Sequence, residues 1–146
     1  MSVPVGITVP KLFPVTGAFA PAFAAYYLYL NLQVSAVRSH KETYLGSKGD
    51  DDQKLLVADR SHGNFVENVP MALLVAAIAE ANGGNRRTIT GSLAALLLFR
   101  IVHVELGLKS QGSLGWGRPI GYFGTLGFVA GMSGYAAYLV KSYWGF

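Results

Sequence analysis

The chain has 146 residues, of which 51% are hydrophobic and 14% are charged. That length allows one domain or one compact membrane bundle, and the charge content is about half that of a soluble domain. The basic excess, a formal net charge of +4, lacks the basic aromatic stripe of a nucleic-acid surface. The absence of cysteine excludes a disulfide framework, a thiol nucleophile and a cysteine-based metal site. The composition therefore favours a membrane protein, with no nucleic acid and no metal among its expected ligands.

Residues 12–37 form the first predicted element and contain no charged side chain. Residues 119–140 form a second charge-free run near the end of the chain. Each run is long enough to cross roughly 30 Å of hydrocarbon as an α-helix. A soluble domain of this size rarely contains two such runs. We therefore expect an integral, multi-pass membrane protein whose first and last spans cover about residues 12–39 and 118–142.

Two further apolar segments lie between these runs. They become full spans, at about residues 55–82 and 87–109, only if each carries charged residues inside the membrane. The polar loop SHKETYLGSKGDDDQK joins the first two spans, and short links join the others. The expected fold is all-α: one transmembrane domain over residues 1–146, folded as an up-down four-helix bundle with both ends on one side.

The basic residues predict an orientation for this bundle. The smaller group lies on the side of both chain ends and consists of Lys11, Arg86, Arg87 and Lys141. The larger group lies beside the first and third loops and consists of Arg38, Lys41, Lys48, Lys54, Arg60, Lys109 and Arg118. Because basic loops tend to stay in the cytoplasm, the side of the larger group is predicted to be cytoplasmic.

Polar residues share faces of the two middle helices. Arg60, Asn64 and Glu67 stand at positions i, i+4 and i+7 of one helix, spread over about 10 Å of its axis. Arg100 and His103 form a second polar face on the next helix. A charged side chain near the bilayer centre costs at least about 2.5–3.5 kcal/mol. These residues are therefore expected to pair, to face the bundle interior or to line a wet cleft.

Two interpretations of these faces remain open. In the first, Glu67 pairs with Arg100 across helices in a purely structural network. In the second, the faces line a polar pocket for an anion, because Glu67 and Glu105 cannot neutralise all the arginines at one membrane face. Those arginines are Arg38, Arg60, Arg100 and Arg118.

Three segments resemble one protein family. RSHGNFVENVP, residues 60–70, resembles the second-helix signature of the MAPEG family, the membrane-associated proteins in eicosanoid and glutathione metabolism: Arg, three residues, Asn, two residues, Glu, then Pro. LQVSAVR, residues 32–38, resembles the end of the first helix in its leukotriene C4 synthase branch. FRIVHVELGL, residues 99–108, resembles the third-helix pattern of Arg followed three residues later by Tyr or His. The four-span layout and the chain length also fit, so the resemblance covers essentially the whole chain.

This resemblance implies a homotrimer in which glutathione, as co-substrate, binds between neighbouring subunits at one membrane face. In such proteins the matching Arg and Asn bind the tripeptide and the Glu recognises its γ-glutamyl amine. Arg residues reach the carboxylates of the tripeptide. Carried over residue by residue, the expected glutathione-binding residues are Arg38, Arg60, Asn64, Glu67, Arg100 and His103.

The resemblance also implies a catalytic arginine near the start of the fourth helix, where it stabilises the glutathione thiolate. Arg118, in GWGRPIGY, is the candidate, because a guanidinium beside sulfur favours the nucleophilic thiolate. The spacing from Arg100 is longer than in the leukotriene synthase branch, and QGSLGWG looks like an inserted loop. The alternative is that Arg118 only anchors the helix end at the interface. His103 is either a base for the thiol or a satisfied core histidine.

The expected function is that of a membrane-bound glutathione transferase, which conjugates the thiolate to a lipophilic electrophile from the bilayer and also reduces lipid hydroperoxides. A glutathione-dependent isomerase, a lipid-binding scaffold and an ion or proton pathway through Glu67, Arg100, His103 and Glu105 are the alternatives. The membrane is expected to be microsomal in a eukaryote and the inner membrane in a bacterium, with the active site on the cytoplasmic side. Glycines recur through the last span, including a GxxxG from Gly127 to Gly131, and are expected to let helices pack closely.

Overall fold

The computed structural model describes residues 10–40, 42 and 53–145. Its long helices are α1 (Pro14–His40), α2 (Gln53–Ala81), α3 (Arg86–His103) and α4 (Gly117–Leu139). The π-helical turn η1 (Val104–Leu108) continues α3, and the short 3-10 helices η2 (Gln111–Ser113) and η3 (Lys141–Trp144) flank α4. No strand occurs among the described residues. Most of the polar loop after α1 lies outside the described residues. Lys41 and Lys48, two of the basic residues on which the predicted orientation rests, lie there too.

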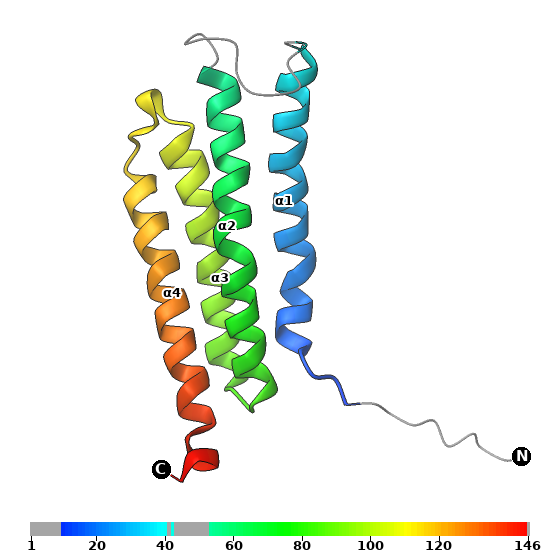
Figure 1. Cartoon of the computed structure of the whole chain (residues 1–146), viewed down its shortest axis with the longest axis vertical. Coiled ribbons are helices and arrows are strands. Elements are labelled where there is room, and N and C mark those ends of the chain that lie inside the picture. Colours follow the sequence, from blue (N-terminus) through cyan, green and yellow to red (C-terminus); the bar gives the residue numbers. More distant parts are fainter. Residues whose placement is uncertain (1–9, 41, 43–52, 146) are drawn as a thin grey trace, which may run out of the picture.

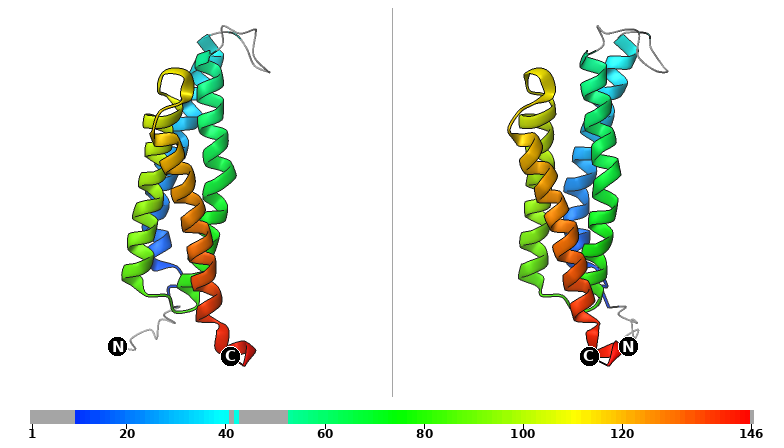
Figure 2. Two further views of the ribbon diagram at one scale, coloured as in Figure 1. Left: turned by 90° about the vertical axis from the view of Figure 1, so that its left-hand side faces the viewer. Right: turned by 60° about the vertical axis from the view of Figure 1, so that its left-hand side comes forward.

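The four long helices run alternately up and down, side by side, so that α1 begins and α4 ends at the same end of the bundle (Figures 1 and 2). The core between them is built from aliphatic and aromatic side chains of all four helices, among them Leu30, Phe65, Leu96 and Phe128. This arrangement confirms the predicted all-α four-helix bundle.

The helices pack closely where they carry small residues. Ala72, Ala76 and Ala79 of α2 are fully buried. At Gly121 of α4 an added Cβ would collide with His103 and with the carbonyl of Phe99, so this glycine lets α4 touch α3. The expectation for Gly127 and Gly131 is wrong within one chain, because an added Cβ at either position would meet nothing within 4 Å.

The end of the bundle where α1 begins is held together by caps that cross between elements. The Glu80 carboxylate, at the end of α2, accepts hydrogen bonds from the backbone N–H groups of Val15 (2.6 Å) and Thr16 (2.8 Å) and from the Thr16 hydroxyl (2.7 Å). The Asn85 side chain caps α3 by accepting from the N–H groups of Arg87 and Thr88. These side chains satisfy N–H groups that have no partner inside their own helices.

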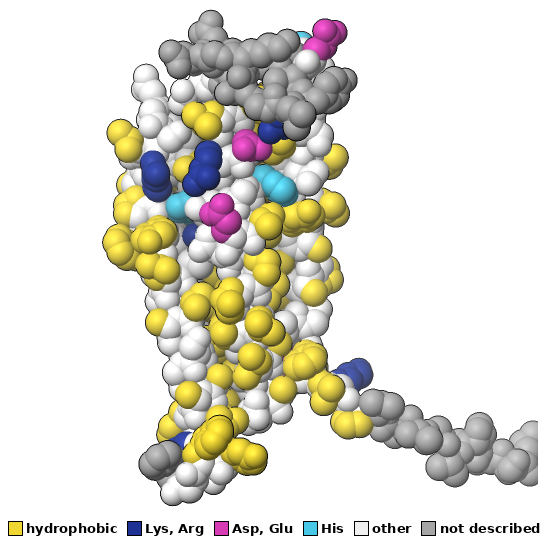
Figure 3. Space-filling view, viewed as in Figure 1, with side chains coloured by type: hydrophobic (Ala, Val, Ile, Leu, Met, Phe, Trp, Pro, Cys, Tyr) yellow, Lys and Arg dark blue, Asp and Glu magenta, His cyan; other side chains and the backbone are white. Residues whose placement is uncertain are grey.

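Polar and apolar side chains separate along the length of the bundle (Figure 3). On the face shown, hydrophobic side chains cover the middle, and most Lys, Arg, Asp, Glu and His side chains gather toward the end where α1 finishes and α2 begins. By length and composition, two of the described helices, Gln53–Ala81 and Arg86–Leu108, could cross a membrane. These are the two helices that carry the polar faces identified in the sequence.

Candidate functional site

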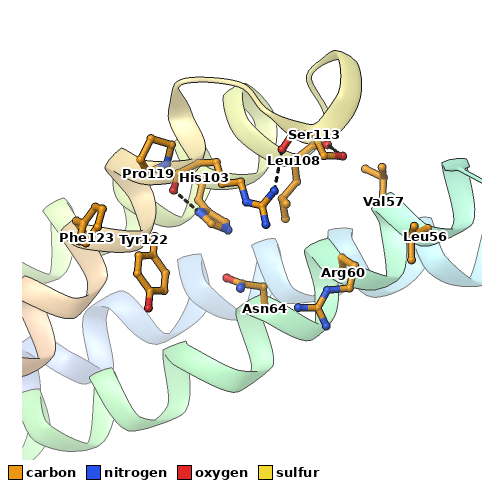
Figure 4. A pocket seen from close by; sticks show the side chains of 11 residues that line it. Leu56, Val57, Arg60, Asn64, His103, Leu108, Ser113, Pro119, Tyr122 and Phe123 are labelled. Atoms are coloured by element: carbon orange, nitrogen blue, oxygen red, sulfur yellow. Dashed lines mark hydrogen bonds between the residues drawn. The ribbon is translucent and has the colours of Figure 1, made fainter.

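A cavity of about 660 Å³ opens between α2 and α4, near the connection that joins α3 to α4. It contains four of the residues singled out in the sequence, which come from three elements: Arg60, Asn64, His103 and Arg118. Figure 4 shows Arg60 and Asn64 on α2, facing His103 and Tyr122 across the cavity. None of the described residues that line it is acidic. The cavity therefore has a cationic wall without an internal counter-charge.

Arg60 and Asn64 reach the cavity because they stand one helical turn apart on α2, as their spacing predicts. Arg60 is exposed at the cavity mouth, and Asn64 lies deeper. The Asn64 Oδ1 accepts a hydrogen bond of 2.8 Å from Nη1 of Arg100. That bond fixes the amide, so its Nδ2 donor is the part of Asn64 that is free to meet a ligand. Asn64 is therefore oriented by α3 before anything binds.

Arg100 does not line the cavity itself but is bonded to Asn64, which does, and only 2% of its surface is exposed. Its Nη2 donates to the Gly121 carbonyl (2.8 Å), and its buried Nε has no hydrogen-bond partner among the described residues. Glu67 is exposed on α2, so the Glu67–Arg100 pair that the sequence left open does not form within the chain. Both bonded partners of Arg100 are neutral, and its positive charge stays close to the cavity wall.

His103 is buried and places one ring nitrogen against the start of α4. Its Nδ1 lies 2.9 Å from the Arg118 carbonyl oxygen. Because a carbonyl only accepts, Nδ1 must carry a proton, and in the neutral ring this tautomer leaves the lone pair on Nε2. The ring lines the cavity. His103 thus offers the cavity a neutral hydrogen-bond acceptor.

Arg118 stands in the first turn of α4 and lines the cavity from the side opposite α2. Its Nη1 donates to the Ser113 carbonyl (3.1 Å) in the connection before α4. The backbone of Arg118 packs directly on Gly107, where an added Cβ would come within 2.6 Å of the Arg118 nitrogen. The connection between η1 and α4 thus folds into a turn that holds this guanidinium at the cavity rather than away from it.

Four of the seven predicted residues line the cavity, and Arg100 bonds to one of them, whereas Arg38 and Glu67 lie apart from this group. Arg38, at the end of α1, forms an exposed ion pair of 3.1 Å with Asp59. Glu67 is exposed on α2 between the exposed apolar side chains of Val66 and Met71. One chain therefore does not bring Arg38 and Glu67 to the other five predicted residues.

Two polar residues that line the cavity, Tyr122 and Ser113, were not predicted from the sequence. Tyr122 follows Arg118 by four positions on α4, so the helical spacing that was applied to α2 could have found it. Ser113 lies in an irregular connection, where spacing carries no such information.

Beside the cavity, η1 directs a second polar group toward α1. The Lys109 N–H bonds to the Val104 carbonyl five residues earlier (2.9 Å), which is the wide π-helical turn. Glu105, inside that turn, accepts from Lys109 Nζ (2.8 Å) and from the Tyr26 hydroxyl (3.2 Å). Lys109 also donates to the Tyr29 hydroxyl. Glu105 is thus committed to α1 and to its own turn, and does not join Arg100 and His103.

The apolar helices and the polar cavity near one end describe a helical membrane protein with a ligand-sized cationic site. The model of the MAPEG family matches residues 16–138. The chain belongs to the MAPEG family, whose members are membrane proteins of glutathione and eicosanoid metabolism, and the resemblance found in the sequence is confirmed. No curated protein and no solved structure showed significant similarity to the chain. Among the described residues no group of three or more His, Cys, Asp or Glu side chains could hold a metal ion.

Proposed function

We propose that this protein is a membrane-bound glutathione transferase and that the cavity between α2 and α4 holds the tripeptide. The observation that carries the proposal is that Arg60 and Arg118 meet in one cavity next to the buried Arg100, with no acidic side chain among the described lining residues. Glutathione has two carboxylates, and guanidinium groups bind carboxylates through paired, charge-assisted hydrogen bonds. The charge of the site and the charge of the proposed co-substrate are complementary.

Arg118 is the proposed catalytic residue. A guanidinium beside the sulfur stabilises the thiolate, which is the reactive nucleophile. The thiol gives up its proton to water, and the sulfur forms a C–S bond with an electrophilic carbon. The electrons of the bond that breaks leave with the displaced group. The hydrogen bond from Arg118 to Ser113 supports this role because it holds the side chain at the cavity wall.

His103 and Asn64 are proposed to orient the tripeptide. His103 Nε2 suits an N–H group of the ligand, since this neutral acceptor stands among cations. The Asn64 amide, fixed by Arg100, suits a carboxylate through Nδ2. Holding the thiol in one place accounts for a large part of the rate of such bimolecular reactions. A lipophilic electrophile would reach the sulfur along the exposed apolar residues Tyr122, Phe123 and Leu56 at the cavity wall.

We further propose that a homotrimer completes the site. Glu67 and Arg38 do not line the cavity of their own chain. A carboxylate that is exposed between Val66 and Met71 on an apolar helix is costly to leave against lipid. In the trimer, a neighbouring subunit would bring Arg38 and Glu67 to the glutathione carboxylates and ammonium. With four spans, the basic end of the bundle that contains the cavity would face the cytoplasm.

Thiolate formation tests this proposal directly. The protein is purified in detergent, glutathione is added near neutral pH, and thiolate absorbance is followed by difference spectroscopy. We expect a saturable signal that is lost in Arg118→Ala while calorimetric binding of glutathione persists. Arg86→Ala is the matched control, because it removes an exposed arginine at the other end of the bundle.

The other outcomes separate the alternatives. Glutathione binding without thiolate in the unaltered protein would favour a scaffold or a cofactor role for the tripeptide, and would contradict the transferase. Turnover of a model electrophile that Arg118→Ala leaves unchanged would remove this arginine from the mechanism. The absence of any binding would return the cationic cavity to the structural or ion-pathway interpretations.

A further inference from the structure

A second cavity, of about 650 Å³, lies at the same end of the bundle between α1, α2 and the connection that follows η1. It shares a single lining residue, Val57, with the glutathione cavity proposed above. The two cavities therefore adjoin at Val57, in the second turn of α2. The second cavity has the size of pockets that bind small molecules in proteins, which usually span about 300–1,000 Å³.

The lining of this second cavity is amphipathic. Its walls include the aliphatic side chains of Ala36, Val37 and Ala58, from α1 and α2. Two lysines, Lys54 and Lys109, and several amide side chains complete it, and no described lining residue is acidic. A mostly apolar pocket with a few polar groups at one side is typical of a site for an amphiphile.

The two lysines differ in what they can offer a ligand. Lys109 is committed to Glu105 (2.8 Å) and to the Tyr29 hydroxyl (3.0 Å). The ammonium of Lys54 forms no hydrogen bond or ion pair with any residue in the described part of the chain. Lys54 thus leaves one positive charge of the second cavity without a counter-charge from any described residue.

We propose that the second cavity binds a long-chain fatty acid from the bilayer, with the carboxylate on Lys54 and the acyl chain against Ala36, Val37 and Ala58. The carboxylate complements the charge of Lys54, and the acyl chain replaces water at the apolar wall. None of the residues assigned to glutathione lines this second cavity.

The same geometry lets the bound fatty acid change the position of the Arg118 guanidinium. This regulatory role rests on the proposed function of Arg118. Residues 109–112 line the second cavity, whereas the next residue, Ser113, lines the first. The Ser113 carbonyl is the group that holds the Arg118 guanidinium. The segment is a tight turn in which Gly112 and Ser113 both have positive φ (68° and 56°) and Ser113 N–H bonds to Ser110. Because so short a turn moves as a unit, a fatty acid packed against Lys109 and Gln111 shifts the carbonyl that positions Arg118.

Photolabelling tests the site without any use of glutathione. The full-length protein in phosphatidylcholine nanodiscs is exposed to a palmitic acid analogue with a photoreactive diazirine, and the labelled peptides are mapped by mass spectrometry. We expect labelling of the peptides that line the second cavity, competed by oleate but not by methyl oleate. Lys54→Ala should reduce this labelling about fivefold, since it removes an ion pair, and Ala36→Trp should reduce it by filling the cavity. Lys11→Ala is the control, an exposed lysine at the other end.

The possible results test the binding site, the role of Lys54 and the regulation of Arg118 separately. Labelling spread over all lipid-facing helices, or equal competition by the methyl ester, would show partition into the membrane only and overturn the site. Labelling that survives Lys54→Ala would overturn the role of Lys54. Oleate should change the glutathione thiolate signal of the unaltered protein and not that of Lys54→Ala. If specific labelling is found but this signal does not respond, the site stands and the regulation is wrong.

Discussion

The two ends of the bundle use their polar groups in opposite ways. At the end where α1 begins, the side-chain oxygens of Glu80 and Asn85 accept hydrogen bonds from the backbone of α1 and α3, so these oxygens are already occupied within the fold. At the other end, Arg60 and Arg118 line open space and a buried nitrogen of Arg100 has no partner among the described residues. Polar side chains that cap helices stabilise the fold, whereas those left incompletely bonded around a cavity are available to a ligand. The comparison predicts that substitutions at the first end change stability and those at the second change binding.

The largest expected effect on stability is that of Glu80→Ala. It removes the acceptor for three hydrogen bonds between α2 and the start of α1, so we expect a loss of about 1–3 kcal/mol of unfolding free energy. Glutathione affinity should not change, since Glu80 lies at the end away from the cavity. Thermal unfolding in detergent and calorimetric titration would measure the two quantities. Glu80→Gln keeps one acceptor oxygen and should lose less. An altered glutathione affinity with intact stability would break the comparison.

Arg100→Lys should weaken glutathione binding by about tenfold, because a single ammonium cannot replace the guanidinium fork that bonds Asn64 and Gly121 at once. Asn64 would then lose its fixed orientation while a positive charge remains in place. Isothermal titration of glutathione checks this expectation. Arg87→Lys, an exposed arginine at the other end, is the control. Full affinity in Arg100→Lys would show that charge alone, and not the fixed amide, matters for binding.

Asn85→Ala should cost about 1 kcal/mol, the usual effect of removing an N-cap, because the N–H groups of Arg87 and Thr88 lose their acceptor. Asn85→Asp should retain the cap and the stability. Chemical unfolding at fixed detergent concentration would measure both variants. An Asn85→Asp variant as unstable as Asn85→Ala would mean that the cap is not what Asn85 contributes.

Glu67→Gln should have the smallest effect, a few-fold loss of glutathione affinity with unchanged stability. The amide has the size of the carboxylate but cannot offset the ammonium of the ligand, and within one chain Glu67 is exposed. Titration with glutathione and with a deaminated analogue checks the reason: the unaltered protein should lose affinity for the analogue, and Glu67→Gln should not distinguish the two. Equal discrimination by both proteins would place Glu67 away from the γ-glutamyl amine.

The sequence predicted side-chain positions correctly where they depend on the geometry of a single helix. The Arg60–Asn64 spacing predicts a shared face, and both side chains reach one cavity. The same rule includes Glu67, yet this residue points away from the cavity. Residues at positions i, i+4 and i+7 span about 10 Å of helix axis. The cavity reaches only the first two of them, Arg60 and Asn64.

Taken by itself, the sequence determined the four-helix bundle, the family and the cationic character of one end, because hydrophobic runs, helical spacing and the Arg-Asn-Glu pattern are local properties. Only the tertiary structure decided that Arg100 bonds to Asn64 and Gly121 rather than to Glu67, and that Gly121 packs against α3 while Gly127 does not. It also decided that the connection before α4 holds Arg118 at the cavity through the carbonyl of Ser113. Each of these depends on which face of one helix meets another, and that is set by the packing of the whole bundle.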